Sequence, residues 1–439
     1  MRLCVISILV VAILLTIPGL TGHYDLALNQ SILNGKRIIV LQDRLIVLCG
    51  NVSTLIIPGT EQVRFYSAHS IAGRLIITGS FMKHPALFIT LGDGICDIRQ
   101  GVSRIKTTTI VINSLNGTFT DVSLIDEGNL LLLGYMVREG LTKGIAVLLH
   151  TANNKYAVKE VFTTKGYYES IFLHLIHSKD GNICINCIIR DIYRGYVPAI
   201  LCTKPSTLTK FLLNTTSFTR SYHFTYINNT LSIYYLIGSD ERDFLVLIIR
   251  KDNQVKCDTY VIDKVGIDRV SPTIMDDSSI TYIIMGKHGK YLARISLHEG
   301  NLYLLRLNMS DVSIVRLKDS IYTVTFSGSL RHVKGYENVL KLNRLNCLSV
   351  NEHVRLINLS SIELYRYNLT FTVVSRKTKL MMGGIGEGTT LTTTTVKEVS
   401  SNKSGILPRP HKSYPYTPYI TLILGIILVS IYVILRLKS

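Results

Sequence analysis

The stretch Gly128-Asn-Leu-Leu-Leu-Leu-Gly-Tyr135 begins the pattern that decides the fold. A polar break separates it from a second apolar run, Lys143-Gly-Ile-Ala-Val-Leu-Leu-His150, and a short turn leads to a third, Asn153-Asn-Lys-Tyr-Ala-Val-Lys-Glu-Val161. Turn residues bound each run, and the segments lack the 3.6-residue amphipathic period of a surface helix. The pattern therefore predicts short strands joined by turns.

The same pattern recurs along the chain at intervals of roughly 40–55 residues. Four antiparallel strands at this spacing are typical of a β-propeller blade, in which the inner strands are covered on both faces and read as continuous apolar runs. We predict an all-β ectodomain folded as a β-propeller, with two stacked β-sandwich domains as the alternative. Copies of the first run are Asp43–Gly50, Gly73–Ser80, Gly181–Ile188, Asn229–Leu236, Ser279–Gly286 and Ser320–Ser327.

The repeat also carries a local signature: a Gly-Asn turn, an apolar strand, then glycine followed within two residues by Thr, Ser or Tyr. Over about residues 38–375 this pattern resembles that of bacterial and archaeal surface propellers with degenerate repeats, although it has no WD or kelch motif. The resemblance implies a surface-displayed propeller with six or seven blades.

The two ends of the chain predict export and membrane anchoring. A basic start, an apolar run from Leu3 to Leu15 and small residues before His23 indicate a secretory signal peptide over residues 1–22, with a retained N-terminal anchor as the alternative. The run from Ile420 to Leu435 is apolar between flanking tyrosines and a basic end, which predicts one transmembrane helix over residues 418–436 with residues 437–439 on the cytoplasmic side.

Between these ends, the sequence divides into two parts. Residues 23–380 form the expected propeller ectodomain, and residues 381–417 are rich in Gly, Thr, Ser and Pro. Such a composition cannot bury a core and predicts an extended stalk. The Thr-rich stalk followed by a terminal helix resembles archaeal envelope proteins, so we expect a single-pass cell-membrane protein with its ectodomain outside the cell.

The chain is strongly basic, with a formal net charge of +18. An exported protein of this charge is expected to attract polyanions such as acidic glycans. The Lys and Arg residues are scattered and are not interleaved with aromatics, so no nucleic-acid partner is expected. Anionic glycans and other envelope proteins are the expected partners besides the membrane.

The nine N-x-S/T sequons predict a glycosylated surface, because the chain is expected to be exported. The acceptor residues are Asn29, Asn51, Asn116, Asn214, Asn228, Asn308, Asn358, Asn368 and Asn402.

Seven cysteines remain after removal of the expected signal peptide, and an oxidising exterior favours disulfides. A hairpin centred between Arg194 and Gly195 would place Cys187 and Cys202 opposite each other, so this pair is the predicted disulfide.

No motif in the sequence indicates catalysis, a cofactor or a metal. The sharpest cluster is His174-x-x-His177 with Cys184-x-x-Cys187, but residues three apart on a strand point to opposite faces and cannot chelate easily. The glycines between Gly383 and Gly388 follow no clear strand, which argues against a phosphate-binding loop. The acidic pairs Asp126/Glu127 and Asp276/Asp277 occupy expected turns and are interpreted as structural.

These observations favour a binding or adhesion protein, or a structural protein of the cell envelope. An anchored extracellular hydrolase that uses the propeller channel is one alternative, and a viral attachment glycoprotein is another. Charge clustered at the channel would favour the hydrolase, whereas a rim of exposed aromatic residues would favour binding.

Overall fold

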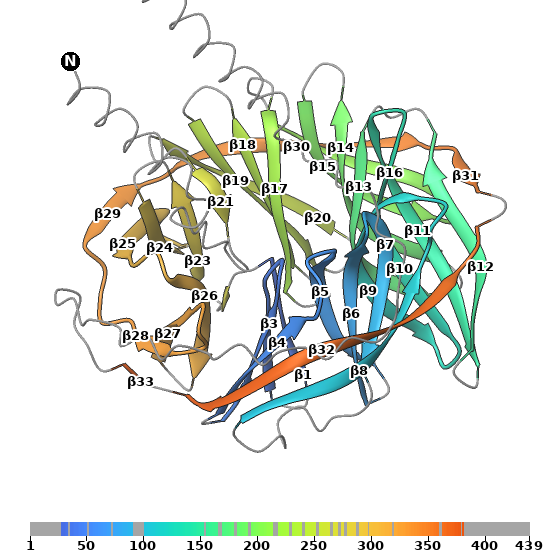
Figure 1. Cartoon of the computed structure of the whole chain (residues 1–439). Coiled ribbons are helices and arrows are strands. Elements are labelled where there is room, and N and C mark those ends of the chain that lie inside the picture. The colour runs from blue at the N-terminus through green and yellow to red at the C-terminus, as the bar shows by residue number, and fades with distance from the viewer. Residues whose placement is uncertain are drawn as a thin grey trace, which may run out of the picture. The chain divides into compact units, whose positions relative to one another are not determined.

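In a computed structural model, the described part of the chain runs from residue 28 to residue 381 with short gaps (Figure 1). The expected signal peptide (1–22) and membrane helix (418–436) lie outside it. No helix long and apolar enough to cross a membrane occurs in this part. The described ranges are 28–33, 36–50, 52–71, 73–90, 101–152, 155–165, 169–179, 182–191, 195–213, 218–227, 231–238, 242–251, 254–263, 267–270, 274–275, 279–286, 289–296, 298–317, 320–359, 362–378 and 380–381.

Successive strands pair antiparallel with their chain neighbours and form groups that follow one another along the sequence. The first three groups are β1 (Asn29–Leu33), β2 (Lys36–Val40), β3 (Leu45–Cys49), β4 (Val52–Pro58); β5 (Val63–Ile71), β6 (Arg74–Phe81), β7 (His84–Thr90), β8 (Gly101–Val111); and β9 (Asn116–Asp126), β10 (Asn129–Arg138), β11 (Leu141–Ala152), β12 (Lys155–Thr164).

The remaining groups repeat this antiparallel order, and the last two contain shorter strands. They are β13 (Ser170–Lys179), β14 (Asn182–Asp191), β15 (Gly195–Thr203), β16 (Ser206–Leu213); β17 (Phe218–Ile227), β18 (Leu231–Gly238), β19 (Arg242–Lys251), β20 (Gln254–Asp263); β21 (Ile267–Val270), β22 (Ile274–Met275), β23 (Ser279–Gly286), β24 (Gly289–Ser296), β25 (Asn301–Leu307); and β26 (Asp311–Leu317), β27 (Ser320–Thr325), β28 (Leu330–His332).

The cores lie between successive groups, which gives the sheets a propeller-like arrangement. On β10, Leu130 and Leu132 pack toward β5–β8, while Leu131 and Leu133 pack toward β13–β16. The four-leucine run that opened the sequence analysis is therefore apolar on both faces because both faces are covered. The first and last groups also share a core, in which Ile39 and Leu48 cluster with Val315 and Val324.

The last described segment does not form another group but pairs with the others in turn. We call its strands the C-terminal belt: β29 (Asn338–Lys341), β30 (Asn343–His353), β31 (Leu356–Asn358), β32 (Tyr365–Lys377) and β33 (Leu380–Met381). β29 joins β25, β30 joins both β20 and β16, and β31 joins β12. β32 joins both β8 and β4, and β33 joins β28. The last strand of every group thus gains a partner from the belt, drawn in orange in Figure 1.

The predicted all-β class is confirmed, and the repeat was located correctly along most of the chain. Six of the predicted runs fall on β6, β10, β14, β18, β23 and β27, which are the second or central strands of their groups. The repeat did not predict the belt, whose residues were assigned to blades. β29 is exposed throughout, so this strand has no buried apolar run to mark it.

Candidate functional site

A buried carboxylate with two histidines lies on the strands farthest from the belt. Asp121 Oδ1 is 2.6 Å from His69 Nε2, and Asp121 Oδ2 is 2.8 Å from His174 Nδ1. The Asp121 side chain is 4% exposed, whereas those of His69 and His174 retain 30% and 12% exposure. The carboxylate is therefore almost inaccessible to solvent, while the imidazoles remain partly exposed.

The three residues come from the first strands of three successive groups. His69 is on β5, Asp121 on β9 and His174 on β13, and β9 contacts both of the other strands. These first strands end their groups on the side away from the belt. In a propeller-like arrangement that side faces the central axis.

A bulge on each of these strands adjusts the direction of the side chains. The register skips Tyr66 on β5, Thr120 on β9 and Leu173 on β13. A bulge inserts one unpaired residue and changes which face the following side chains occupy. At the β9 bulge, the Thr120 hydroxyl donates to the carbonyl oxygen of Phe172 at 2.6 Å, which ties β9 to β13 beside the carboxylate.

Two glycines of the sequence repeat make room for these bulges. Gly79 lies opposite the β5 bulge and Gly134 opposite the β9 bulge. A Cβ at either position would collide with the backbone carbonyl of Arg64 or Thr118, so only glycine fits. Gly79 and Gly134, which follow the apolar runs of β6 and β10, therefore help to position His69 and Asp121.

The ion pairs shift the pKa values of the cluster. Burial alone would raise the pKa of Asp121, but the positive charges and hydrogen bonds of His174 and His69 lower it well below its ordinary value. Burial lowers the pKa of His69, but the charge and hydrogen bond of Asp121 outweigh this effect and raise it overall. The 2.6 Å separation between His69 Nε2 and Asp121 Oδ1 makes this a close ion pair.

Two tyrosines complete the surroundings of the cluster. Burial, Tyr135 and Asp121 together raise the pKa of Tyr66, so its phenol stays protonated as a donor.

Each imidazole also has a second ring nitrogen that Asp121 does not contact, and this nitrogen could exchange a proton with a bound group. No group of three His, Cys, Asp or Glu side chains could hold a metal within the described residues.

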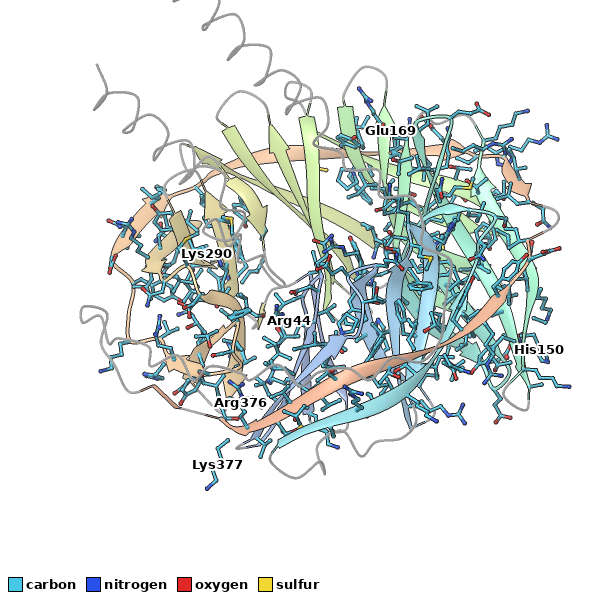
Figure 2. All side chains as sticks on the ribbon, in the orientation of Figure 1. Arg44, His150, Glu169, Lys290, Arg376 and Lys377 are labelled. Carbon is cyan, nitrogen blue, oxygen red and sulfur yellow. A yellow bond between two sulfur atoms is a disulfide. The ribbon has the colours of Figure 1, made fainter. Side chains whose placement is uncertain are left out.

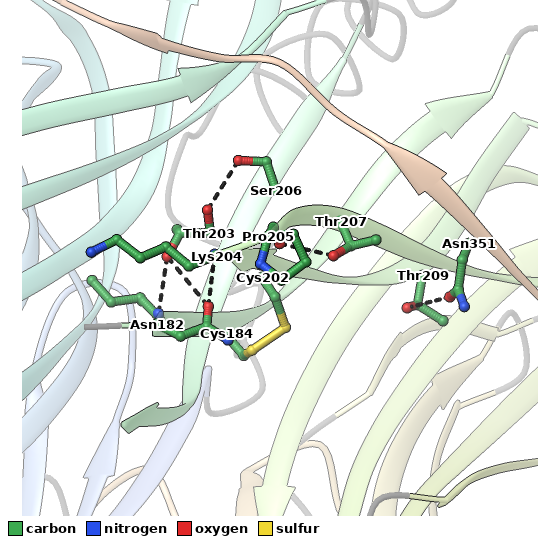
Figure 3. The surroundings of a disulfide bond; sticks show 11 residues. Asn182, Cys184, Cys202, Thr203, Lys204, Pro205, Ser206, Thr207, Thr209 and Asn351 are labelled. Atoms are coloured by element: carbon green, nitrogen blue, oxygen red, sulfur yellow. Dashed lines mark hydrogen bonds between the residues drawn. A yellow bond between two sulfur atoms is a disulfide. The ribbon is translucent and has the colours of Figure 1, made fainter. Parts of the chain in front are cut away.

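The predicted disulfide Cys187–Cys202 is wrong. Cys202 is bonded to Cys184, with a Cα–Cα distance of 4.1 Å, and Cys187 is a buried free thiol (Figure 3). The register pairs Asp191 with Gly195, which moves the hairpin centre from its expected position and places Cys187 opposite Ala199. Cys49 and Cys347 are each disulfide-bonded as well.

The acidic pairs, the His/Cys cluster and the glycine cluster of the sequence analysis are only partly within the described residues. Asp126 caps its own turn, because its Oδ1 accepts from the Gly128 N–H at 3.0 Å and from Asn129 at 2.8 Å, as the structural interpretation predicted. His174 forms the ion pair with Asp121, and Cys184 forms the disulfide with Cys202. The His177 side chain is outside the described part. Asp276, Asp277 and the glycines from Gly383 to Gly388 are also outside it.

Four of the predicted glycosylation sites are exposed, namely Asn116, Asn308, Asn358 and Asn368. The side chains of the other five lie outside the described part, namely Asn29, Asn51, Asn214, Asn228 and Asn402.

No known protein family matches the sequence, and no curated protein matches it. The site must therefore be interpreted from its own geometry. Sequence reasoning missed His69 and Asp121 because the cluster draws one residue from each of three strands, so no short motif joins its members. The one available signal was the glycine after two of the apolar runs, Gly79 and Gly134, each of which lies opposite a bulged strand.

Proposed function

We propose that this protein is an exported, single-pass membrane protein whose seven-bladed propeller head binds anionic glycans or other envelope components. The seven groups of strands support this blade number, since the core shared by the first and last groups would close the ring. Residues 381–417 would form the stalk and residues 418–436 the anchor.

The C-terminal belt is the observation that carries this proposal. It is hydrogen-bonded to the last strand of every group and ends at Met381, where the proposed stalk begins. Tension from an anchored stalk would therefore act on a segment that is linked to the whole head rather than to one group. This arrangement suits a protein that holds on to something outside the cell.

Charge and sequon placement add support. The net charge of +18 favours acidic partners, and a displayed surface would present exposed sequons such as Asn116 and Asn368.

The test uses the full chain in a secretory host. We expect surface biotinylation to label it, glycosidase treatment to lower its apparent mass, and alkaline carbonate to leave it in the membrane fraction. A glycan array at low salt should show binding to acidic glycans. An unglycosylated chain found in the soluble intracellular fraction would refute the proposal.

A channel hydrolase is the second candidate, and the His69–Asp121–His174 cluster favours it. An imidazole held by a carboxylate is a common general base. We would test it with His69→Gln and His174→Gln variants against a panel of glycoside and ester substrates. Turnover that persists unchanged in both variants would exclude the cluster as its source.

A further inference from the structure

A cavity of about 300 Å³ lies where the last two groups of strands meet. Its apolar walls include Leu305 and Leu307 from β25, together with Val333 and Tyr336 from the segment after β28. Volumes near 300 Å³ are at the small end of ligand pockets, which combine apolar walls with a few placed polar groups. The cavity is therefore sized for one small ring rather than an extended chain.

The charged residues of this cavity are mainly basic. Arg306 and Lys334 are exposed at its edge and Arg331 is half-buried in its wall, while Glu337 is its one acidic residue. Two other cavities among the described residues have a more balanced charge. One of about 520 Å³ places Lys159 beside Glu160, and one of about 210 Å³ places Arg74 with Glu127.

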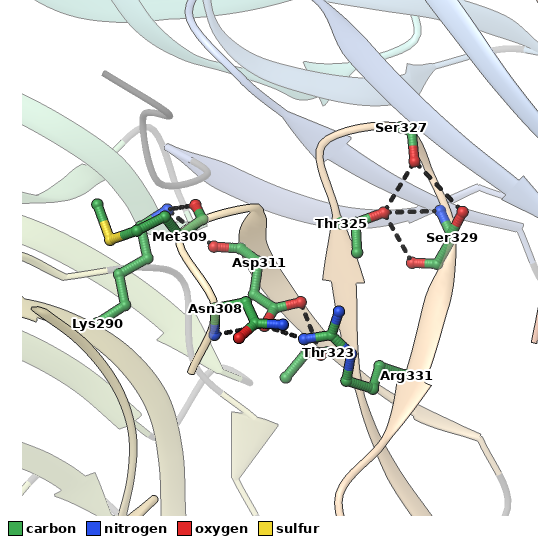
Figure 4. Close-up of polar contacts among 9 residues, drawn as sticks. All are labelled: Lys290, Asn308, Met309, Asp311, Thr323, Thr325, Ser327, Ser329 and Arg331. Atoms are coloured by element: carbon green, nitrogen blue, oxygen red, sulfur yellow. Dashed lines mark hydrogen bonds and ion pairs between the residues drawn. The ribbon is translucent and has the colours of Figure 1, made fainter. Parts of the chain in front are cut away.

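Arg331 is held in place by neighbouring polar side chains. Its Nη1 donates to Asp311 Oδ2 at 3.0 Å, and the Asp311 side chain is fully buried (Figure 4). Thr323 also donates to this carboxylate at 3.0 Å. With its amide oriented to match its partners, Asn308 accepts from Nη1 and Nη2 of Arg331 at 2.7 and 3.1 Å.

A buried lysine fixes the turn that carries Asp311. Lys290 Nζ donates to the backbone carbonyls of Met309 and Asp311 at 2.7 and 2.9 Å. Figure 4 shows Lys290 and Arg331 on opposite sides of Asp311, and Arg331 also lines the cavity. The guanidinium is oriented before any ligand arrives, which reduces the entropy that binding must cost.

We propose that this cavity binds a single anionic sugar residue. Its carboxylate or sulfate would contact Arg331, Arg306 and Lys334, and the ring would lie against Leu307 and Tyr336. Charge-assisted contacts from arginine suit such anions because the planar guanidinium can donate two parallel hydrogen bonds. This inference rests on the proposed binding function and names the ligand class and the place.

The experiment compares two double variants of the full chain. Arg306→Ala/Lys334→Ala removes two cations at the cavity edge. Arg376→Ala/Lys377→Ala removes the same two residue types at the exposed end of β32, where Figure 2 labels them. Arg331 is left intact, because its loss would strand the buried Asp311 carboxylate and endanger folding. Ser310→Ala is added to every variant, because it removes the Asn308 sequon at the cavity while keeping Asn308 itself.

The probes are glucuronate, glucose 6-sulfate and glucose, with dissociation constants measured by calorimetry at low salt. We expect one or both anionic sugars to bind and glucose to bind far more weakly. The cavity variant should raise Kd at least about tenfold, the change expected from losing one charge-assisted contact, and the control should stay within about twofold. Whether the carboxylate or the sulfate binds identifies the anion.

Equal losses in the two double variants would overturn the cavity assignment and leave only general electrostatic attraction. Equal binding of glucose would overturn the anionic ligand. If none of the three sugars binds, this inference is refuted, whereas the broader binding function is judged separately by the glycan array.

Discussion

Replacing Asp121 with asparagine should destabilise the head by a measurable and pH-dependent amount. The carboxylate contacts two imidazoles at 2.6 and 2.8 Å and is nearly fully buried. Hydrogen bonds to charged groups contribute about 1.5–3 kcal/mol each. Asparagine keeps one oxygen acceptor, so Asp121→Asn should lower the free energy of unfolding by about 2–4 kcal/mol under mildly acidic conditions.

The pH dependence follows from the directions of the two pKa shifts. The pKa of His69 is raised above its ordinary 6.5, so its stabilising contribution is complete below pH 6.5 and is lost as the pH rises through the higher folded value. The pKa of Asp121 is lowered from 3.8, so its contribution is present above pH 3.8 and is lost as the pH falls through the lower folded value. The cluster therefore stabilises most between these two limits, and Tyr66 does not titrate there because its pKa is raised from 10.0.

Urea unfolding at about pH 5.5 and about pH 8.5 provides the assay, since these values bracket the ordinary pKa of histidine. The wild type should be more stable at the lower value, and Asp121→Asn should remove most of that difference. Asp126→Asn is the matched control, because Asp126 is an exposed carboxylate on the same strand, β9. A difference between the two pH values that survives in Asp121→Asn would refute the reasoning.

Two further predictions concern the belt and the cysteines. Phe371→Ala in β32 should lower the free energy of unfolding by about 3–5 kcal/mol, because the Phe371 ring is fully buried against Phe65 and Phe88. The control is Tyr365→Ala on the same strand, where the side chain is 44% exposed. Denaturant titration should show a loss of less than about 1 kcal/mol for this control. Equal losses would show that the belt is not anchored through this ring. An unreduced peptide map should show Cys184–Cys202, with Cys187 alkylated only after unfolding because burial raises its thiol pKa. The same map should link Cys347 to Cys257. Asp258 pairs with Asn346 between β20 and β30, so Cys257 and Cys347 occupy the next pair of positions in this register. A disulfide between Cys347 and another cysteine would contradict that register.

The sequence predicted those parts of the fold that depend on local pattern. Leu130 to Leu133 indicated a strand covered on both faces, and Gly134 lies within that strand, opposite the β9 bulge. The belt could not be predicted, because pairing between β32 and β4 joins segments at opposite ends of the head and leaves no local periodicity.

The site was beyond sequence reasoning for a similar reason. His69 and Asp121 meet because a bulge on β5 and another on β9 turn these side chains toward each other. A bulge depends on the register between strands, which the sequence of one strand does not reveal. The disulfide error has the same origin, since a hairpin centre shifted by a short distance exchanged Cys184 for Cys187 as the partner of Cys202.

The belt also constrains the order in which the protein can mature. The belt strands β29 to β33 are synthesised after all the groups of strands that they join. The edges of β4 and β8 that pair with β32 therefore remain unpaired during most of synthesis. Such late, distant pairing slows folding and exposes strand edges to aggregation. A nascent chain of this protein should therefore depend on chaperones until its final residues emerge, and premature termination within residues 338–381 should yield insoluble product rather than a smaller working head.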